Sequence, residues 1–340
     1  MSLKNYNTFG ISVQCKKLVV CNTILQMIEN WQEAQTLNEP CFIIGEGSNI
    51  LFTEDLNGTV LVNKLKGIEV NETLDAYHLH VNGGENWHNL VQYTLDNGMP
   101  GLENLALIPG VVGSAPIQNI GAYGLELKDV FEYADLVNLN DGTVHRMNES
   151  ECKFGYRESI FKHQFKKGYA IVSVGLILKK EWKPKLNYAG LSKLNPETVT
   201  PREIFNLVCA IRRTKLPDPE IIGNAGSFFK NPVVSETIAN KLKVEYENMP
   251  YYKDIKGIKL SAAWLIDRLE LKGYRVRDAA VHKNHAMVLV NLGNASGKDV
   301  VELAKYIRKK VGEKFDIWLE PEVRFISATG EVDAVQLLSL

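Results

Sequence analysis

The sequence contains no long hydrophobic run and no large excess of charge of either sign. Its longest strand-like apolar stretch, residues 170–178, is interrupted by Ser173 and Gly175. A membrane span needs roughly 18 apolar residues in a row. The 39 Lys and Arg residues nearly balance the 40 Asp and Glu residues, which leaves a formal charge of −1. Because an extended positive field holds polyanions, this balance argues against nucleic acid or an anionic membrane as a partner.

Cysteine is scarce, and no two cysteines have the Cys-x-x-Cys spacing. The five are Cys15, Cys21, Cys41, Cys152 and Cys209. An odd number without paired spacing argues against a disulfide framework and against a thiolate metal site. The first nine residues lack the apolar segment of a signal peptide, so we expect a cytoplasmic protein. His282 and His285 have no third ligand at a useful spacing, and we expect no metal.

The 340 residues, 45% of them hydrophobic, suggest a globular chain of two or three domains. Strands are expected at residues 17–21, 41–44 and 59–62. Between the first two, Thr23 and Gln26 form a capping-box pattern that predicts a helix. Its apolar face is expected to contain Ile24, Leu25, Ile28 and Trp31.

From about residue 67 the pattern changes toward strands and glycine-rich loops. A helix is expected over 85–96, with Trp87, Leu90, Val91 and Leu95 on one side. Further strands are expected at residues 134–139, 143–147 and 170–178. We expect these segments and the first 65 residues to form one α+β unit.

A third helix is predicted from Thr200, where a cap, a proline and Glu203 follow the helix-start pattern, to about Arg212. Pro217 and Pro219 then interrupt the chain and suggest a hinge. Residues 223–320 read as a separate α/β domain, whose clearest helix is expected to end at Gly312.

Two glycine-containing segments are candidates for ligand contact. Residues 45–49, Gly-Glu-Gly-Ser-Asn, directly follow a strand, and their backbone N–H groups can bind an anion such as a diphosphate. They match neither the Rossmann fingerprint nor a P-loop, and a plain strand-to-strand turn is the alternative. Residues 108–124 are apolar and rich in small residues. They can lie flat against a planar cofactor or form a buried, turn-rich connection.

Polar candidates lie in four other segments. Arg157 sits among aromatic residues and needs either a carboxylate such as Glu158 or an anionic ligand. Ser227, between Gly226 and two phenylalanines, is either a structural turn serine or a proton donor. The basic residues 212–215 can bind a phosphate or end a solvated helix, and Glu320 and Glu322 can be exposed charges.

Seven segments taken together, in order, closely resemble the UDP-N-acetylenolpyruvoylglucosamine reductase family over almost the whole chain. They are residues 7–10, 45–49, 105–110, 154–157, 215–219, 223–232 and 318–324. The resemblance implies an α+β fold with an FAD-binding region of the vanillyl-alcohol-oxidase (PCMH) type, made of two α+β subdomains, and a C-terminal α/β substrate-binding domain. The implied subdomains are 1–66 and 67–218, the second joined by the C-terminal strand 320–340, and the substrate domain is 219–319.

The resemblance also implies a two-step cycle in peptidoglycan precursor synthesis. NADPH reduces FAD and leaves, and UDP-N-acetylglucosamine enolpyruvate then takes a hydride from flavin N5 to become UDP-N-acetylmuramate. Ser227 resembles the proton donor, and Arg157 and Glu322 resemble the pair that stabilises the enolic intermediate. Glu322 would help if it is protonated, or if it orients Arg157 or a water.

The resemblance further implies binding residues. Tyr188 resembles the substrate-capping tyrosine of the type I subclass, Lys215 and Asn231 resemble diphosphate contacts, and His285 lies near the uridine. The implied cofactor contacts are Gly45, Glu46, Gly47, Ser48, Asn49, Ile108, Pro109, Gly110, Gly113, Ser114, Ile117, Asn119, Gly121, Ala122, Tyr123, Arg212 and Arg324.

The partner expected from these assignments is a small nucleotide sugar, with the protein acting as a monomer. Two other functions remain open at this level. One is another FAD-dependent oxidoreductase of the same superfamily, of the alcohol-oxidase type. The other is a catalytically dead module that binds flavin or a nucleotide sugar.

Overall fold

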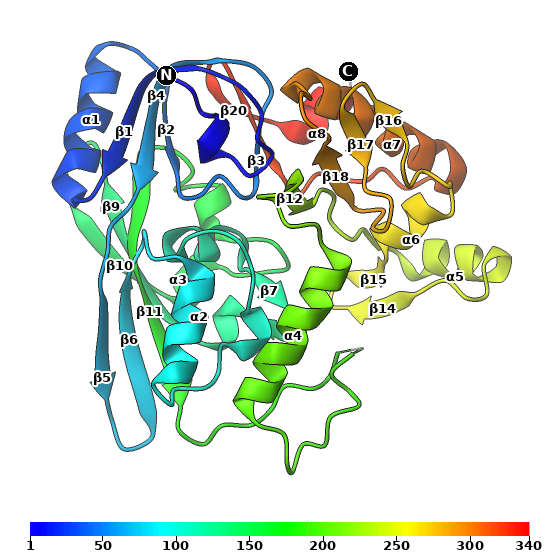
Figure 1. Cartoon of the computed structure of the whole chain (residues 1–340), viewed down its shortest axis with the longest axis horizontal. Coiled ribbons are helices and arrows are strands. Elements are labelled where there is room, and N and C mark those ends of the chain that lie inside the picture. Colours follow the sequence, from blue (N-terminus) through cyan, green and yellow to red (C-terminus); the bar gives the residue numbers. More distant parts are fainter. Residues whose placement is uncertain (189, 340) are drawn as a thin grey trace. The chain divides into compact units, whose positions relative to one another are not determined.

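The structure, a computed structural model, describes residues 1–188 and 190–339 (Figure 1). Contacts along the chain group into two compact units. Unit 1 contains Met1–Cys15, Ser48–Asn57 and Lys215–Leu340, and unit 2 contains Lys16–Gly47 and Gly58–Thr214. The division into 1–66, 67–218 and 219–319 stays a prediction.

Unit 2 begins with a three-stranded sheet covered by helix α1 (Ile24–Thr36). The strands, in spatial order, are β1 (Cys15–Cys21), β4 (Leu56–Asn63) and β2 (Cys41–Ile44), and β2 and β4 are parallel. The predicted cap is confirmed, because the Thr23 side chain accepts a hydrogen bond from the Gln26 N–H at 3.2 Å.

The predicted apolar face of α1 is partly wrong. Ile24 and Leu25 are exposed, while Met27, Trp31 and Ala34 are buried. The buried stripe follows the i, i+4, i+7 spacing of a helix face, and Leu25 lies off this face. Ile24, three residues before Met27, is exposed at the first position of the helix. Met27 and Trp31 belong to a buried cluster that also includes Val137 and Ala170. This cluster connects the three-stranded sheet to the larger sheet of unit 2.

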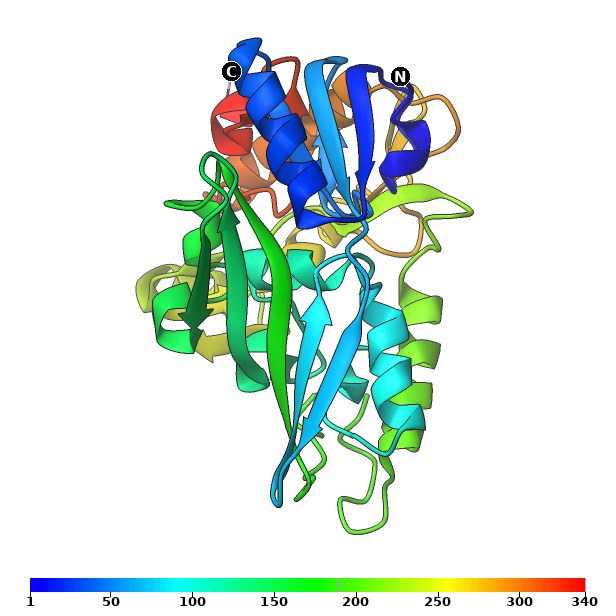
Figure 2. The same ribbon diagram turned by 90° about the vertical axis from the view of Figure 1, so that its left-hand side faces the viewer.

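The larger sheet of unit 2 has five antiparallel strands, whose full length is visible in Figure 2. In spatial order they are β10 (Val144–Asn148), β9 (Phe131–Asn138), β11 (Tyr169–Lys179), β6 (Ala76–Asn82) and β5 (Ile68–Glu72). The three strands predicted at 134–139, 143–147 and 170–178 are therefore confirmed, with small shifts at their ends.

Helices α2 (Trp87–Asp96) and α4 (Pro201–Lys215) lie side by side in unit 2 (Figures 1 and 2). The His88 and Phe205 rings stack between them, with centroids 5.6 Å apart. Both predicted helices are thus confirmed. At the start of α4, the Thr200 N–H donates to the Glu203 carboxylate and the Glu203 N–H donates to the Thr200 hydroxyl, as the capping pattern requires.

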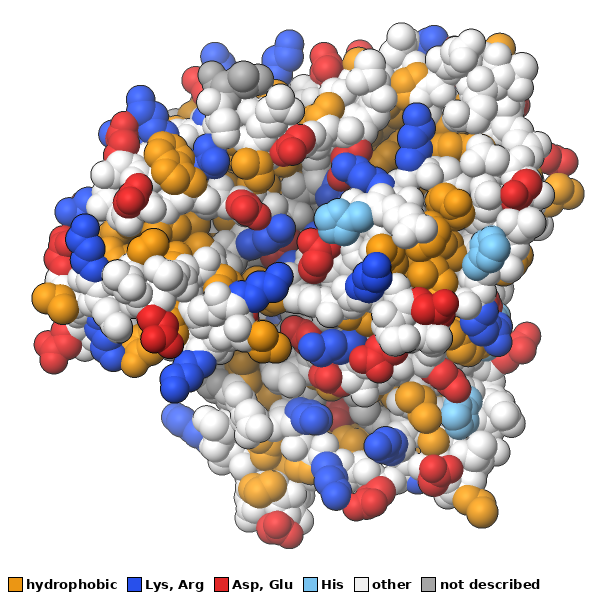
Figure 3. Space-filling view, turned by 180° about the vertical axis from the view of Figure 1, so that it is seen from behind, with side chains coloured by type: hydrophobic (Ala, Val, Ile, Leu, Met, Phe, Trp, Pro, Cys, Tyr) orange, Lys and Arg blue, Asp and Glu red, His pale blue; other side chains and the backbone are white. Residues whose placement is uncertain are grey.

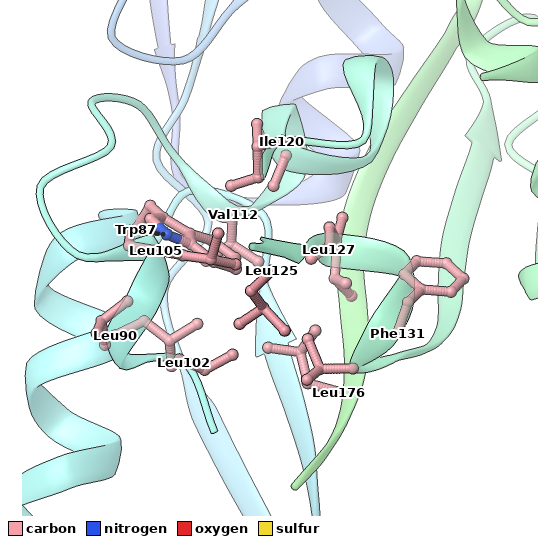
Figure 4. Packing of buried hydrophobic residues seen from close by; sticks show 14 of the residues in the cluster. Trp87, Leu90, Leu102, Leu105, Val112, Ile120, Leu125, Leu127, Phe131 and Leu176 are labelled. Atoms are coloured by element: carbon pink, nitrogen blue, oxygen red, sulfur yellow. Dashed lines mark hydrogen bonds between the residues drawn. The ribbon is translucent and has the colours of Figure 1, made fainter. Parts of the chain in front are cut away.

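The main hydrophobic core of unit 2 fills the space between α2, the five-stranded sheet and the glycine-rich loop (residues 107–124). Figure 4 shows this packing, in which Trp87 and Leu90 of α2 meet Leu105, Leu125 and other apolar side chains. Short elements surround the core: η2 (Glu103–Leu105), η3 (Val112–Gln118), β7 (Gly121–Ala122), β8 (Leu125–Glu126), η4 (Leu127–Asp129), α3 (Glu149–Cys152) and η5 (Ile160–Lys162). The candidate loops therefore start from a rigid base.

Unit 1 begins with the short helix η1 (Lys4–Tyr6) and combines small sheets with longer helices. One sheet has the order β12 (Gly223–Ser227), β18 (Val288–Asn291), β17 (Ala279–Val281), β16 (Arg275–Val276). A second has the order β13 (Val233–Val234), β15 (Gly257–Leu260), β14 (Tyr251–Asp254), and a third β20 (Gly330–Val332), β19 (Arg324–Ser327), β3 (Ile50–Phe52). The helices are α5 (Glu236–Glu245), α6 (Ala262–Asp267), α7 (Gly297–Phe315) and α8 (Ala334–Ser339).

The predicted end of the helix at Gly312 is wrong. Helix α7 continues to Phe315, and Asp316, with φ +56°, forms its C-cap. Gly312 is buried within the helix, where a Cβ atom would lie 2.8 Å from atoms of the Trp318 ring. This glycine is therefore required by packing and does not mark a helix end.

Charged side chains of both signs are interspersed on the molecular surface. Figure 3 shows Lys and Arg residues alternating with Asp and Glu residues over one face. This distribution agrees with the nearly neutral formal charge. Among residues 1–188 and 190–339, no helix combines the length and the apolar character needed to cross a membrane.

Candidate functional site

The Gly-Glu-Gly-Ser-Asn segment forms the turn after β2, and Glu46 connects it to the glycine-rich loop. Its carboxylate accepts hydrogen bonds from Asn86 Nδ2 at 2.7 Å and from the Gly110 N–H at 3.0 Å. A Cβ atom on Gly45 would lie 2.3 Å from Val111 Cγ2, so only glycine fits there. Glu46 thus holds two candidate cofactor loops together, and its direct contact with a cofactor stays a prediction.

Leu107 lies at the start of the glycine-rich loop and has a left-handed backbone (φ +57°). Hydrogen bonds hold both its N–H and its carbonyl. The Leu107 N–H donates to His88 Nδ1 at 3.1 Å, and Arg212 Nε donates to the Leu107 carbonyl at 3.2 Å. His88 was not among the predicted residues. The pKa of His88 is lowered, first by burial and then by Arg213 and Arg212, which keeps Nδ1 available as an acceptor.

Farther along the loop, several predicted cofactor residues contact protein groups. Gly113 packs on Gly83, and a Cβ atom on Gly113 would lie 2.7 Å from the Ile171 carbonyl oxygen. The Ser114 hydroxyl donates to the Val111 carbonyl at 2.7 Å. Close packing therefore requires glycine at position 113. The cofactor assignments of the loop residues stay predictions, namely those of Ile108, Pro109, Gly110, Gly113, Ser114, Ile117, Asn119, Gly121 and Ala122.

Tyr123 lies between a cation and a second tyrosine. Its ring meets Tyr188 edge to face, with centroids 5.0 Å apart, and its hydroxyl is hydrogen-bonded to Arg212. Burial lowers the pKa of Arg212, the Tyr123 contact opposes that shift, and the nearby Arg157 adds to it. Unit 2 therefore brings together four predicted site residues. Two guanidinium groups near one another favour an anionic or carbonyl-rich ligand.

Arg157 occupies a tight turn with a left-handed backbone (φ +53°). Its Nη2 donates to the Gly121 carbonyl at 2.9 Å. A Cβ atom on Gly121 would lie 3.3 Å from Arg157 Nη1 and 3.0 Å from Glu126 Cγ, so glycine at this position lets the guanidinium approach the loop. Non-glycine residues with positive φ cluster at functional sites, because the strain must be held by surrounding contacts.

In unit 1, the chain brings Ser227 and Glu322 to neighbouring backbone positions. The Glu322 N–H donates to the Phe228 carbonyl at 2.8 Å, and Phe229 forms a bridge with Pro321. Ser227 is half-buried and follows a register shift between β12 and β18. Gly226, with φ +70°, makes this bulge possible. Such bulges redirect side chains next to active sites.

An aromatic cluster holds this pair of segments in place. Phe228 and Phe229 are fully buried, and the Phe228 ring contacts Phe9 and Phe325. Asn49 Nδ2 donates to the Glu322 carbonyl at 3.3 Å. Ser227 and Glu322 therefore extend from rigid supports.

The other predicted residues of unit 1 contact different protein groups. Arg324 forms a two-bond ion pair with Glu331, at 3.1 and 2.6 Å, so a carboxylate engages its charge. Asn231 Oδ1 accepts from the Ala262 N–H at 3.0 Å. His285 is half-buried, and its pKa is lowered, first by burial and then by charges that include Lys215. The roles of Ser48 and Lys215 in binding stay predictions, as does that of Gly47 in unit 2.

Two buried residues that the sequence reasoning missed hold the segment that leads to Tyr188. Glu103 accepts a hydrogen bond from Trp182 Nε1 at 2.6 Å. Asn104 Nδ2 donates to the Lys185 carbonyl at 2.9 Å and to the Tyr123 carbonyl at 2.8 Å. Both side chains are at most 2% exposed. Asn104 thereby fixes the Tyr188 segment beside Tyr123. Because both acceptor carbonyls lie far from Asn104 in the chain, no local sequence signal could have found this role.

The residues of unit 2 fit a large cofactor of the FAD type. Gly45 lets the turn pack against the Val111 side chain, Gly113 lets the loop pack against the backbone of Gly83 and Ile171, Tyr123 and Arg212 offer polar donors, and the loop around them is apolar. This is the donor set expected for a planar ring system with carbonyl groups and a diphosphate. Within the described residues, no group of three or more His, Cys, Asp or Glu side chains can hold a metal.

Comparison with known proteins extends the assignment to the whole chain. The family model for the FAD binding domain matches residues 15–148, and that for the C-terminal domain of UDP-N-acetylenolpyruvoylglucosamine reductase matches residues 218–326. The chain is 56% identical, over 340 residues, to the UDP-N-acetylenolpyruvoylglucosamine reductase of Pectobacterium atrosepticum, covering 100% of this chain and 99% of the relative.

Two further relatives agree. The enzyme of the same name from Escherichia coli K12 is 56% identical over 339 residues, which are 99% of each chain. The crystal structure of the Thermus caldophilus reductase superposes with a TM-score of 0.65 at 26% identity, covering 96% of this chain and 97% of that one. The chain therefore belongs to the UDP-N-acetylenolpyruvoylglucosamine reductase family, flavoenzymes that bind FAD and reduce UDP-N-acetylglucosamine enolpyruvate to UDP-N-acetylmuramate for peptidoglycan synthesis.

Proposed function

We propose that this reaction proceeds in two half-reactions, and that Ser227, Arg157 and Glu322 act in the second. NADPH, the reductant of this family, acts in the first and then leaves. The nucleotide sugar enters the same pocket afterwards. The observation that carries the proposal is the backbone bond from Glu322 to Phe228, which supports two of the three proposed catalytic residues on one rigid base. The approach of Arg157 to those two is part of the proposal.

The residues proposed to hold FAD lie mainly in the turn at 45–49 and in the loop 108–123, with Arg212 behind the loop. FAD, when bound, supplies a hydride to the enolpyruvyl group. Arg212 supports this assignment because a buried guanidinium needs a nearby anion or several acceptors. The cofactor contact proposed for Arg324 competes with its ion pair to Glu331.

Arg157 is proposed to bind the carboxylate of the enolpyruvyl group. Hydride addition at the terminal alkene carbon pushes negative charge through the adjacent carbon into that carboxylate. A fixed guanidinium stabilises this charge most where it develops, which lowers the barrier more than it strengthens ground-state binding. Glu322 contributes to the same stabilisation, as a neutral acid or by orienting Arg157 or a water.

Ser227 is proposed to give a proton to the carbon next to the carboxylate. Its hydroxyl is neutral near pH 7, and the bulge at Gly226 holds it in a half-buried position. This converts the enolic intermediate into the lactyl group of the product on one face only.

The nucleotide part of the substrate is assigned to four residues. Lys215 and Asn231 would contact the diphosphate, His285 would lie near the uridine, and Tyr188 would cover the substrate. The edge-to-face contact with Tyr123 supports the Tyr188 assignment, because it places Tyr188 beside the proposed cofactor loop. Lys215 is exposed and is among the charges that act on His285, which supports a shared anion-binding region.

The domain organisation proposed is two FAD-binding subdomains, 1–66 and 67–218, the second joined by residues 320–340, and a substrate domain, 219–319. The two family models, which match 15–148 and 218–326, support a boundary near residue 218. We also propose a monomer that acts in the cytoplasm. Free thiols at all five cysteines support a reducing compartment.

Anaerobic flavin spectroscopy tests the proposed function. The purified protein should be yellow and should lose its flavin absorbance when NADPH is added. Adding UDP-N-acetylglucosamine enolpyruvate without oxygen should then restore it. An alcohol-oxidase type enzyme would be reoxidised by air and not by the nucleotide sugar, and a dead module would respond to neither NADPH nor substrate.

A further inference from the structure

The turn that carries Arg157 is closed by backbone hydrogen bonds. The Gly155 N–H donates to the Glu158 carbonyl at 3.0 Å, and the Glu158 N–H donates to the Gly155 carbonyl at 3.2 Å. Arg157, the third residue of this four-residue turn, has φ +53°. Glycine or asparagine is usual where a turn needs a positive φ, because a side chain disfavours it. An arginine therefore needs other contacts to keep this conformation.

Lys162 provides the most direct of these contacts. Its Nζ donates to the Arg157 carbonyl at 2.7 Å. Lys162 is half-buried and lies in the short helix η5, whose cap, Ser159, donates its hydroxyl hydrogen to the Ile117 carbonyl at 2.6 Å. The short helix that carries Lys162 is thereby joined to the same glycine-rich loop whose Gly121 carbonyl accepts from the Arg157 guanidinium.

Asn119 holds the other side of the turn. It is fully buried, and its Nδ2 donates to the Gly155 carbonyl at 3.1 Å. Two hydrogen bonds thus hold the turn, one from Asn119 to the Gly155 carbonyl and one from Lys162 to the Arg157 carbonyl. Rotation of Arg157 toward the ordinary right-handed region would turn its carbonyl away from the Lys162 ammonium. A charge-assisted bond would then be lost.

We propose that Lys162 is a positioning residue for the reaction. It holds Arg157 in the left-handed conformation in which the guanidinium lies against the Gly121 carbonyl. This inference rests on the proposed function, because it gives Lys162 its effect through the charge-stabilising role of Arg157. Substitution of Lys162 is therefore expected to slow the half-reaction that uses the substrate carboxylate and to leave the rate of flavin reduction by NADPH unchanged.

The test compares Lys162→Met, Lys162→Arg and the matched control Lys167→Met in anaerobic stopped-flow experiments on the holoenzyme. Lys167 is exposed and five residues farther along the same segment. Lys162→Met should slow flavin reoxidation by the nucleotide sugar about 10- to 100-fold, the range expected for a small misplacement of a catalytic group. Lys162→Arg should recover most of the rate, and Lys167→Met should match the parent.

In a folded Lys162→Met variant, equal slowing of both half-reactions with a lowered thermal midpoint would show a general structural role, and that result overturns the inference. A parent-like reoxidation rate in Lys162→Met overturns it as well. If Lys162→Met does not fold, the shorter neutral donor in Lys162→Gln is measured in its place, with the same selective slowing expected. Arg157→Met, measured in parallel, separates the two proposals. A parent-like rate there rejects the role of Arg157, whereas a slow Arg157→Met with a parent-like Lys162→Met rejects only the positioning role.

Discussion

The Glu322 N–H donates a hydrogen bond of 2.8 Å to the carbonyl of Phe228, the residue that follows Ser227. Two motifs separated by about ninety residues in the chain thereby share one support. Ser227 lies at the end of β12, whereas Glu322 precedes β19. This relationship makes Glu322 a specific target for substitution.

Glu322→Ala is expected to slow flavin reoxidation by the nucleotide sugar about 10²–10³-fold, as the loss of one preorganised stabilising group does. Reduction of the flavin by NADPH should stay near the parent rate. Glu322→Gln, measured beside it, retains a neutral hydrogen-bonding group. A rate close to the parent in this variant would indicate that Glu322 works as the neutral acid.

The matched control for Glu322 is Glu320→Ala, which removes an exposed carboxylate two residues away. Its reoxidation rate should equal that of the parent. Equal slowing in the two alanine variants, or none in Glu322→Ala, would contradict the assignment.

Lys215→Ala is expected to weaken substrate binding with little change in the maximum rate. A lost charge-assisted phosphate contact is worth about 1.5–3 kcal/mol, or roughly a 10- to 100-fold rise in KM. Steady-state kinetics with varied nucleotide sugar measures both constants. Lys298→Ala, an exposed lysine at the start of α7, serves as the control. A fall in the maximum rate with an unchanged KM would be inconsistent with a binding role.

Arg212→Met is expected to release FAD more readily without unfolding the protein. Burial lowers the pKa of Arg212, so its charge is costly unless the cofactor compensates it. Flavin retained after gel filtration, and the thermal midpoint of the apoprotein, measure the two effects. The neighbouring exposed residue gives the control Arg213→Met. Full retention of FAD in Arg212→Met would remove this residue from the cofactor site.

The lowered pKa of His88 predicts a pH dependence of stability. In the unfolded chain His88 titrates near its ordinary value of 6.5, whereas the folded protein binds the proton less readily. As pH falls through that value, the unfolded chain takes up more protons, and the free energy of unfolding decreases. The contribution is absent at higher pH, where His88 is neutral in both states.

His88→Asn should remove this loss, because the Asn Oδ1 can accept the Leu107 N–H without titrating. Urea unfolding of parent and variant at pH 8, 7, 6 and 5 checks the expectation. The parent should lose stability relative to the variant below about pH 6.5. Two curves that run parallel over this range would refute it.

Local sequence signals predicted helices α1, α2, α4 and α7 and the strands at 17–21, 41–44, 59–62, 134–139, 143–147 and 170–178, whereas the short strands of unit 1 were not predicted. The Thr23 and Thr200 caps marked two helix starts, and alternating hydrophobic runs marked the main strands. The errors arose at positions where tertiary packing, and not the local sequence, determines which residue is needed. Gly312 looks like a helix end in the sequence, but the Trp318 ring, in contact with it, requires a glycine inside α7.

Site residues could be predicted from the sequence where a charged side chain stands among apolar neighbours. Arg157 among aromatic residues is such a case, and the structure gives it an unusual backbone as well. His88, Asn104 and Lys162 escaped prediction because each binds a backbone group. The partner of Asn104 lies 81 residues away in the chain, at Lys185. No local pattern encodes such a contact.

Ser227 is proposed to donate the proton that completes reduction of the substrate. Its most direct test is the rate of anaerobic flavin reoxidation by the nucleotide sugar in Ser227→Ala, after full reduction by NADPH. We predict reoxidation slowed by about 10²–10⁴-fold, the usual contribution of a general acid, with flavin reduction nearly unchanged. Equal reoxidation rates in the parent and Ser227→Ala would rule out Ser227 as the proton donor.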